Sequence, residues 1–430
     1  MKNRTLYDDK FDVAILYYYA TEKLKTLKKK ISNISDMGNQ STALFQGLKD
    51  LPTPLDQSQC VQYKHELLVC GGRGKRCCYS YNTLKNEYKF ICEYPSDIAL
   101  NGHCVVKLVD NNKDSNQITL LSFGGSSCIK KHTLVMKYVS VWSNDNNDNE
   151  VNKASKSSNY NKWVPFTDNH NYPIIIGRDE DDYVGVRALI GGSKNHLLFI
   201  TYYPNNISVF DLSTFQFIKG DALPISIYVI FYHCFVSKSE SRQGQEMMMK
   251  TNKEKNKHNF QMFLFHQQTG LLIKYDEDNN TFRYHKLPVC DDIAPLCKYA
   301  YVYVNDVMLF FGGDGNGVSK LVHKYSIREN KWMTFQNTLL SPLYDCVAIL
   351  SEDNTYAHII GGLNGEQSSS THMKTEVNQW LNEEERKNRI ELKVEKEKEK
   401  KENEIDKIVK KEKDEQQNKM KKDTNVGHAL

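Results

Sequence analysis

The chain has no apolar run long enough to cross a bilayer. Such a span needs about 18 consecutive apolar residues, and the best candidate, 223–236, is interrupted by Pro224 and His233. The apolar run 11–20 contains Asp12 and lacks a convincing signal cleavage site. These absences predict a protein with no membrane span and no secretory signal.

The sequence also lacks a strong excess of one charge and a regular cysteine pattern. Its 57 Lys and Arg against 53 Asp and Glu leave a formal charge of +4 over 430 residues, too little by itself to indicate a nucleic-acid partner. The 11 cysteines are odd in number and lie in apolar runs, not in metal-ligand pairs. This usage favours a reducing, cytoplasmic setting with buried thiols.

The motifs of common catalytic sites do not stand out either. We find no Ser-His-Asp signature, phosphate-binding loop or dinucleotide fingerprint. The glycine-rich stretch 71–75 lacks the P-loop spacing and the helix signal that should follow it. The sequence therefore identifies no catalytic residue.

What the chain does contain is a repeated β unit, clearest at 301–342. Four short runs rich in strand-forming residues follow one another there, joined by turn residues: 301–304, 307–311, 322–327 and 331–335. Gly312-Gly313 ends the second run, because a glycine pair permits positive φ and a close approach of neighbouring chains. The unit is one antiparallel sheet built from sequential hairpins.

This pattern recurs along most of the chain. Glycine doublets close the second run of four units: Gly71-Gly72, Gly124-Gly125, Gly312-Gly313 and Gly361-Gly362. Large side chains seven residues apart follow in five units: Tyr81 and Tyr88, Phe210 and Phe217, Tyr275 and Phe282, Tyr325 and Trp332, and Met373 and Trp380. In the second unit Trp163 stands in the outer position after Tyr138. Sheets of this kind, stacked face to face, would cover each other as in a propeller.

The sixth unit has no fourth strand of its own, since the chain becomes highly charged after Trp380. The segment 43–52 resembles the closing strands of other units, at 215–224 and 333–342. We therefore expect this N-terminal strand to complete the last sheet and close the ring, which removes the exposed strand edges.

Three parts are predicted along the chain. Residues 1–40 form a leader that is poorly ordered or a short helix, and 41–381 form the repeats. Residues 382–430 form a charged tail, either a solvent-exposed helix held by Glu–Lys pairs or a disordered segment. The sparse apolar residues of the tail do not keep a heptad, which argues against a stable coiled coil.

The glycine doublet after an apolar run, followed by Tyr325 and Trp332, resembles the kelch repeat of the galactose oxidase/kelch β-propeller superfamily. The other doublets carry the same resemblance, whereas the third and fourth units lack the doublet in its place. The resemblance covers about 42–381 and implies an all-β, six-bladed propeller closed by the N-terminal strand. It also implies that partners bind on the face formed by loops between blades and between second and third strands.

The loops between second and third strands are expected at 73–77, 126–132, 314–319 and 364–372. They supply these candidate binding residues: Arg73, Lys75, Arg76, Lys130, Lys131, Asp314, Asn316 and Asn364. The basic members would suit an acidic peptide. We expect a monomeric protein-interaction scaffold that binds another protein, with no nucleic acid and no cofactor.

Two other functions stay open. A propeller enzyme acting on a carbohydrate, as an oxidase or isomerase, would use the axial pocket, and a ubiquitin-ligase substrate adaptor would carry a companion domain that neither tail shows. Convergent His, Arg and carboxylate groups in that pocket would favour the enzyme, and Cys and aliphatic side chains the scaffold.

A soft metal is a further alternative, because four cysteines open the first strands of their units: Cys60, Cys104, Cys234 and Cys346. Thiols gathered near the axis could in principle hold zinc or copper. CxxC and HxxxH spacing is absent, however, and a small apolar residue also suits a tight axis. We therefore expect no metal.

Overall fold

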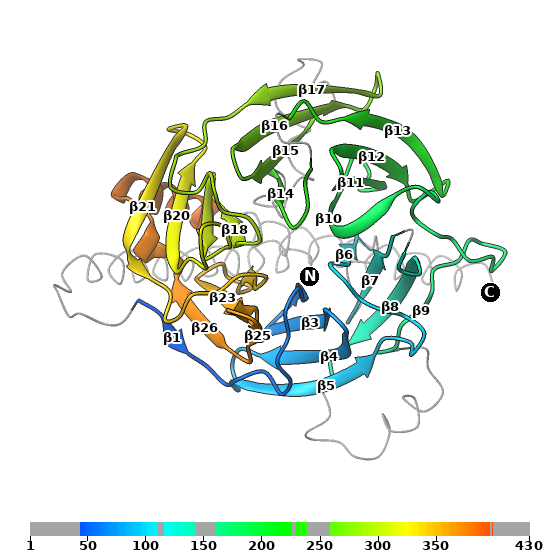
Figure 1. The fold of residues 1–430 in the computed structure, drawn as a ribbon, viewed down its shortest axis with the longest axis horizontal. Helices are drawn as coiled ribbons and strands as arrows, with labels where there is room; N and C mark the ends of the chain where they lie inside the picture. Colours follow the sequence, from blue (N-terminus) through cyan, green and yellow to red (C-terminus); the bar gives the residue numbers. More distant parts are fainter. Residues whose placement is uncertain are drawn as a thin grey trace, which may run out of the picture. The chain divides into compact units, whose positions relative to one another are not determined.

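The computed structural model describes residues 44–109, 116–126, 128–142, 160–225, 229–238, 259–395 and Lys398. The described residues from Leu44 onward form one compact unit whose body is six four-stranded antiparallel sheets, arranged as blades around an axis (Figure 1). This arrangement confirms the predicted six-bladed propeller. The predicted leader and the tail beyond residue 398 lie outside the described residues.

The strands of each blade follow one another from the axis outward. Blades 1 and 2 contain β2 (Gln59–Tyr63), β3 (Glu66–Gly72), β4 (Lys75–Asn82) and β5 (Glu87–Glu93), then β6 (Cys104–Leu108), β7 (Gln117–Gly124), β8 (His132–Val139) and β9 (Val164–Pro165). Blades 3 and 4 contain β10 (Asp182–Gly191), β11 (Leu197–Tyr203), β12 (Asn206–Asp211) and β13 (Gln216–Ala222), then β14 (Cys234–Ser237), β15 (Asn259–His266), β16 (Thr269–Asp276) and β17 (Thr281–Lys286).

Blade 5 contains β18 (Ala300–Val304), β19 (Val307–Phe311), β20 (Leu321–Ser326) and β21 (Lys331–Thr338). Blade 6 contains β22 (Val347–Leu350), β23 (Tyr356–Ile360), β26 (His372–Glu376) and, from the start of the chain, β1 (Gln46–Gly47). A small hairpin of β24 (Leu363–Asn364) and β25 (Gln367–Ser368) lies between its second and third strands.

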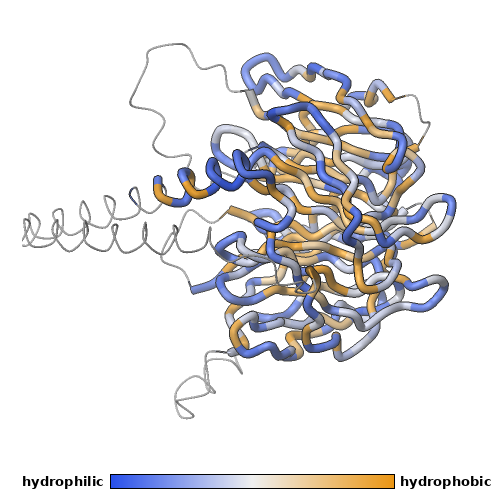
Figure 2. Tube along the Cα trace, turned by 90° about the vertical axis from the view of Figure 1, so that its left-hand side faces the viewer, coloured by the Kyte–Doolittle hydropathy of each residue, from blue (hydrophilic) through white to orange (hydrophobic). Residues whose placement is uncertain are grey.

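Apolar residues follow the strands, and hydrophilic residues gather in the connecting loops (Figure 2). Six buried hydrophobic clusters each join two neighbouring blades, so every sheet covers the next. Among the helices of the described residues, none combines the length and the apolar character needed to cross a membrane.

The aromatic spacing works as predicted in four blades. The residues seven apart lie directly opposite each other in the register of the outer hairpin: Tyr81 and Tyr88, Phe210 and Phe217, Tyr275 and Phe282, and Tyr325 and Trp332. Their rings are in contact, with centroids 5.0 Å apart for the last pair. Trp332 also packs on Phe265 of the preceding blade, at 5.3 Å.

The glycine doublets let the next blade approach closely. Gly312 has φ +66°, and a Cβ there would collide with the carbonyl oxygen of Leu343, in the loop entering blade 6. The neighbouring Gly313 N–H donates to that same carbonyl at 2.8 Å. Gly361 and Gly362 meet Leu55 in the same way at the entry to blade 1. These two doublets are therefore points of close contact between neighbouring blades.

Two predicted outer aromatics were placed wrongly. Trp163 does not face Tyr138, because β9 is short and pairs further along β8; its ring stacks on Tyr94 of blade 1 at 4.7 Å. Trp380 lies in the 3-10 turn η2 (Val377–Trp380), and the strand opposite Met373 is β1. In blade 2 the outer strand pairs in another register, and in blade 6 another chain segment takes the outer place.

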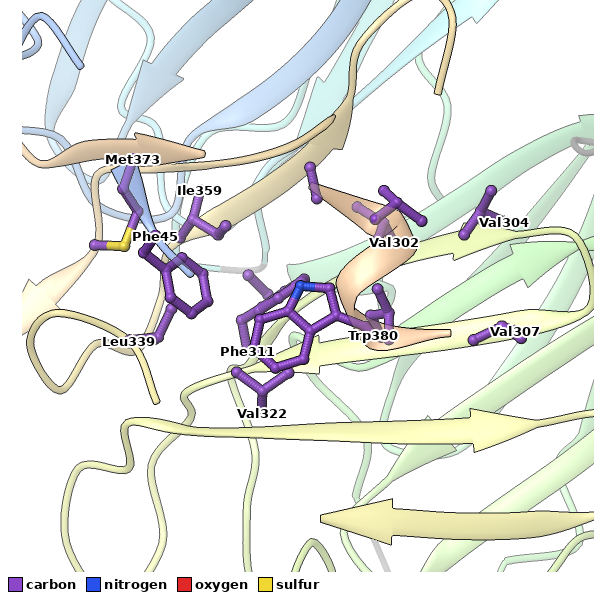
Figure 3. Close-up of a cluster of buried hydrophobic side chains, with 14 of the residues drawn as sticks. Phe45, Val302, Val304, Val307, Phe311, Val322, Leu339, Ile359, Met373 and Trp380 are labelled. Atoms are coloured by element: carbon purple, nitrogen blue, oxygen red, sulfur yellow. The ribbon is translucent and has the colours of Figure 1, made fainter. Parts of the chain in front are cut away.

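The N-terminal strand closes the ring, as predicted. Gln46 and Gly47 pair with Lys374 and Met373 in an antiparallel ladder. The preceding Phe45 is buried between blades 5 and 6 against Trp380, with ring centroids 5.5 Å apart (Figure 3). Because the ladder is only two residues long, burial of this side chain contributes much of the closure.

The charged tail begins as a helix, residues 383–395, that docks on the propeller. Asn382 and Glu385 form a reciprocal capping box, each side chain accepting the other's backbone N–H at 2.8 Å. Glu385 also pairs with the buried Lys324 of blade 5 at 2.8 Å, and Arg389 is buried with bonds to Asn354 and Asn378. The start of the tail is thus held by specific polar contacts, which its composition alone did not indicate.

Replacing Glu385 with alanine is expected to undock this helix. The change removes the partner of a buried lysine and half of the capping box, which should cost about 3 kcal/mol. Amide exchange in 383–395 should then be roughly 100-fold faster by hydrogen-exchange mass spectrometry. Glu384→Ala is the matched control, since its ion pair with Arg328 is solvent-exposed. Equal exchange rates in the two variants would refute the expectation.

Candidate functional site

A small cavity of about 170 Å³ lies on the propeller axis where the inner strands begin. Its polar lining comes from loops entering the blades and from the inner strands β2 and β10, and it includes Gln57, Ser58, Gln59, Arg187, Tyr232, Lys298 and Asp345. Alternating strand direction puts these entry loops on the same face as the loops between second and third strands. We call this cavity the axial pocket.

Backbone hydrogen bonds hold the entry loops together around the axis. The Gln57 N–H donates to the Asp345 carbonyl at 2.8 Å, and the Asp345 N–H donates to the Lys298 carbonyl at 2.9 Å. On the other side, the Tyr232 N–H donates to the Gly185 carbonyl at 2.8 Å. The polar side chains therefore project from a rigid rim, not from free loop tips.

Asp345 is the central charged group of the axial pocket. Its Oδ2 accepts a hydrogen bond from Gln57 Nε2 at 3.1 Å and lies 3.7 Å from Lys298 Nζ. Burial raises the pKa of the Asp345 carboxyl above its usual range, although Lys298 and Gln57 act in the opposite direction. Lys298 and Gln57 thus offset only part of the cost of burying the Asp345 charge.

Cations and an aromatic ring face this carboxyl. Arg187 and Lys298 approach the Tyr232 ring, at 5.8 and 5.5 Å from its centroid. Arg187 Nη1 also donates to the Val186 carbonyl at 2.9 Å. Burial raises the pKa of Tyr232, which keeps its hydroxyl neutral. The axial pocket therefore offers both donors and acceptors to a ligand.

Three buried oxygens in the axial pocket have no hydrogen-bond partner among the described residues: Asp345 Oδ1, Gln57 Oε1 and Ser58 Oγ. Their residues are each less than a tenth exposed. Buried polar atoms are almost always satisfied in folded proteins, so each exception needs an explanation, such as a bound water, ion or ligand. The arrangement fits a ligand that carries hydrogen-bond donors.

The apolar wall of the pocket consists of small residues and thiols. Cys60, Cys104 and Cys346 line it beside alanines of the inner strands. Burial raises the pKa of Cys104 to about 11 and of Cys60 and Cys346 to about 12, so these thiols are neutral and poor nucleophiles. Within the described ranges no three His, Cys, Asp or Glu side chains are grouped to hold a metal ion.

The two histidines that precede inner strands lie behind this wall. His103 Nε2 bonds the Cys70 carbonyl at 3.1 Å, and His233 Nε2 bonds Thr201 Oγ1 at 2.6 Å. Both are fully buried, and burial lowers the pKa of His103 to about 3. They are neutral structural groups that do not line the pocket.

A larger cavity, of about 760 Å³, opens at the opposite ends of the inner strands. It is bordered by Arg389, Leu392 and Lys393 of the docked helix. Phe235, Tyr301 and Ala348 line both cavities and separate them along the axis. The axial pocket remains the better candidate site, because it holds the cluster of buried oxygens without partners.

The predicted basic residues lie around the axial pocket but are mostly paired. Arg73 Nε lies 3.0 Å from the buried Asp56, which also accepts a hydrogen bond from Ser368 at 2.6 Å. Arg76 pairs with Glu93 at 3.3 Å and Lys130 with Asp97 at 2.5 Å. Lys131 donates to backbone carbonyls at 178 and 179.

Lys75 and Arg76 belong to strand β4, because the turn joining β3 to β4 comprises only residues 73 and 74; the predicted loop at 73–77 was too long. Asp314 is held by backbone bonds to Cys297. Asn316 is exposed in its loop, and Asn364 is exposed at the end of β24, in the small hairpin between the second and third strands of blade 6. The structure thus leaves Arg73, Asn316 and Asn364 as candidate loop residues with solvent-exposed surface.

Sequence reasoning missed the axial residues themselves. Gln57, Lys298 and Asp345 each lie two residues before the first residue of their inner strand. Aligning the units on their inner strands would have exposed this row of polar residues at strand entries. That these residues meet at one point follows only from the closed ring of blades.

Comparison with known proteins adds little to this description. No protein-family model matches the chain, and no curated protein matches it. Among 821 matching chains of known structure is one titled "Structure of YjhT". It is 14% identical, with a TM-score of 0.48 over 76% of this chain and 95% of that one.

Proposed function

We propose that this propeller is a protein-interaction scaffold that binds a partner through the face on which the axial pocket opens. The partner would insert a donor-bearing group, such as a lysine, arginine or amide side chain, between Asp345, Gln57 and Ser58. The exposed loop residues around the pocket would contact the surface beside that group. The observation that carries the proposal is the set of three buried oxygens without partners.

The contacts of the basic loop residues give less support to an acidic partner. Arg76 and Lys130 are already neutralised by Glu93 and Asp97, so an acidic peptide would have to displace those carboxylates. Arg73 is half-exposed and remains the best placed of the predicted basic residues. The pocket and the loops thus favour a partner with mixed polar chemistry.

A carbohydrate-acting enzyme is the second candidate, favoured by one observation. Asp345, Lys298, Arg187 and Tyr232 converge on a pocket with space for a small polar molecule. Sugar hydroxyls both donate and accept hydrogen bonds, and a carboxyl with a raised pKa suits acid–base chemistry. The wall of thiols and alanines favours the scaffold. The pocket thus has the convergent polar groups expected of an enzyme and also the small apolar side chains expected of a scaffold.

Asp345→Asn tests the proposal. The tagged full-length chain would be used in affinity purification with mass spectrometry, and the partner would then be purified and titrated. We expect at least tenfold weaker binding by Asp345→Asn, because a charge-assisted hydrogen bond contributes about 1.5–3 kcal/mol. Glu87→Gln is the matched control, because Glu87 is exposed at the start of β5, where the turn between the third and fourth strands lies on the opposite face.

A titration in which Asp345→Asn and Glu87→Gln bind equally well would refute the role of the pocket. Saturable binding or turnover of a monosaccharide from a panel of free sugars, lost in Asp345→Asn and without a protein partner, would instead support the enzyme. The two functions are thus separated by the nature of the ligand whose binding depends on Asp345.

A further inference from the structure

Three thiols lie side by side across blade 1, away from the axial pocket. Cys70 on β3 is directly opposite Cys78 on β4, and Cys78 is directly opposite Cys92 on β5. The neighbouring thiols also affect Cys78, since both act to lower its pKa. The sulfurs therefore form a row across three adjacent strands, with Cys78 in the middle.

The backbone geometry suits a disulfide between neighbours in this row. Residues directly opposite in an antiparallel pair have Cα atoms about 4.5–5.5 Å apart, within the range of about 4.4–6.8 Å that a disulfide spans. Their Cβ atoms, about 4.5–5.5 Å apart, need to approach by only about 1 Å. A β-bulge directly after Cys78 offers local freedom for that shift.

The central thiol has the surroundings of a nucleophile. Burial raises the pKa of Cys78, but hydrogen bonds from Cys70, Cys92 and Trp163 outweigh it and bring the pKa well below its usual value. The Trp163 indole nitrogen lies 3.4 Å from Cys78 Sγ. Cys70 and Cys78 are fully buried, whereas Cys92 is partly exposed on the outer strand. A small oxidant can thus reach the row from the Cys92 side.

We propose that Cys78 and Cys92 form a reversible disulfide on exposure to a peroxide, with Cys70 as a third thiol that can exchange into the bond. The Cys78 thiolate attacks one peroxide oxygen, which gives a sulfenic acid and releases hydroxide. The Cys92 thiol then attacks the Cys78 sulfur, loses its proton and releases water as the disulfide forms. The two electrons pass to the peroxide, which is reduced.

Exchange with Cys70 replaces the Cys78–Cys92 disulfide with another disulfide and needs no further oxidant. Cys70 loses its proton as its sulfur attacks Cys78 Sγ, the Cys70–Cys78 disulfide forms, and Cys92 Sγ leaves and takes up the proton as a thiol. Blade 2 contacts the outer end of the row, where Cys92 Sγ lies 3.7 Å from Met136 Sδ. Cys70 and Cys78 belong to the buried cluster between blades 1 and 2. Disulfide formation would therefore change the packing at the junction between blades 1 and 2.

The test treats the folded full-length chain with hydrogen peroxide, then alkylates free thiols after denaturation and maps the peptides by mass spectrometry. We expect a crosslink that joins the peptide of Cys78 to that of Cys92, lighter by about 2 Da than the two thiols and reversed by dithiothreitol. Cys78→Ser and Cys92→Ser should each abolish this crosslink.

Cys77→Ser is the matched control, because Cys77 is adjacent in sequence and bonds Glu93 instead of the row. It should retain the crosslink, and Cys70→Ser should retain it without exchange to residue 70. Circular dichroism would establish that each variant is folded. A crosslink that survives in folded Cys78→Ser, or full alkylation of Cys78 and Cys92 while the exposed Cys128 is oxidised, would overturn the proposal.

Discussion

Replacing Phe45 with alanine is expected to lower the free energy of unfolding by about 3–5 kcal/mol. Phe45 is 3% exposed and packs against Trp380 and Phe311, with ring centroids 5.5 and 6.3 Å away. The closing segment is otherwise held by a two-residue ladder and by single backbone bonds, such as that from the Leu48 N–H to the His372 carbonyl, which do not replace the buried ring. The whole ring should weaken, since each blade relies on its neighbours.

Urea denaturation followed by tryptophan fluorescence would measure this change. Gln46→Ala is the matched control, because Gln46 is the next residue along but is exposed, and its substitution should stay within about 0.5 kcal/mol. Deletion of residues 44–51 should destabilise the ring further than Phe45→Ala. Equal stabilities of the wild type and Phe45→Ala would contradict closure by the N-terminal segment.

Acidification is expected to destabilise the propeller strongly between pH 6.5 and 4. Burial lowers the pKa of His103 to about 3 and of three other histidines, His132, His266 and His358, to about 4. Near pH 5 the unfolded chain therefore binds more protons than the folded chain, and stability falls as the pH falls. Each such histidine should contribute about 2 kcal/mol between pH 6.5 and 5.

The histidine pair His358 and His372, between blades 6 and 1, shows why protonation is unfavourable in the folded protein. His358 Nδ1 and His372 Nε2 share a hydrogen bond of 2.9 Å, and His372 Nδ1 bonds the Tyr88 hydroxyl at 2.7 Å. Protonation of His372 would introduce a buried charge beside Lys374. Asp345 acts in the opposite direction, since its raised pKa favours the folded state on acidification, but it is a single group.

Urea denaturation repeated from pH 7.5 to 4.5 would test this expectation. His358→Gln should flatten the pH dependence by removing one of the titrating groups. His170→Gln, at an exposed position, should leave the dependence unchanged. A wild-type free energy of unfolding that is constant between pH 6.5 and 5 would show that the buried histidines do not control acid stability.

Local patterns carried most of the fold prediction. A hairpin is set by residues a few positions apart, so the runs around Asn305 and the pair Tyr325 and Trp332 were enough to define blade 5. Where an insertion or a distant segment intervened, the same reasoning failed, as at Trp163 and Trp380. The docking of the helix was missed because it depends on an ion pair between Glu385 and the buried Lys324, which lies 61 residues away in the sequence.

The sequence by itself determined the blade number, the hairpins and the closing role of the N-terminal strand, because each depends on periodicity and on the similarity of short segments. Only the tertiary structure decided the chemistry of the axis. Gln57 and Asp345 are separated by 288 residues, yet their side chains share a hydrogen bond because the closed ring brings all six strand entries to one point. A polar residue at a strand entry acquires its partners from other blades, and those partners are specified by the ring, not by its own neighbours in the chain.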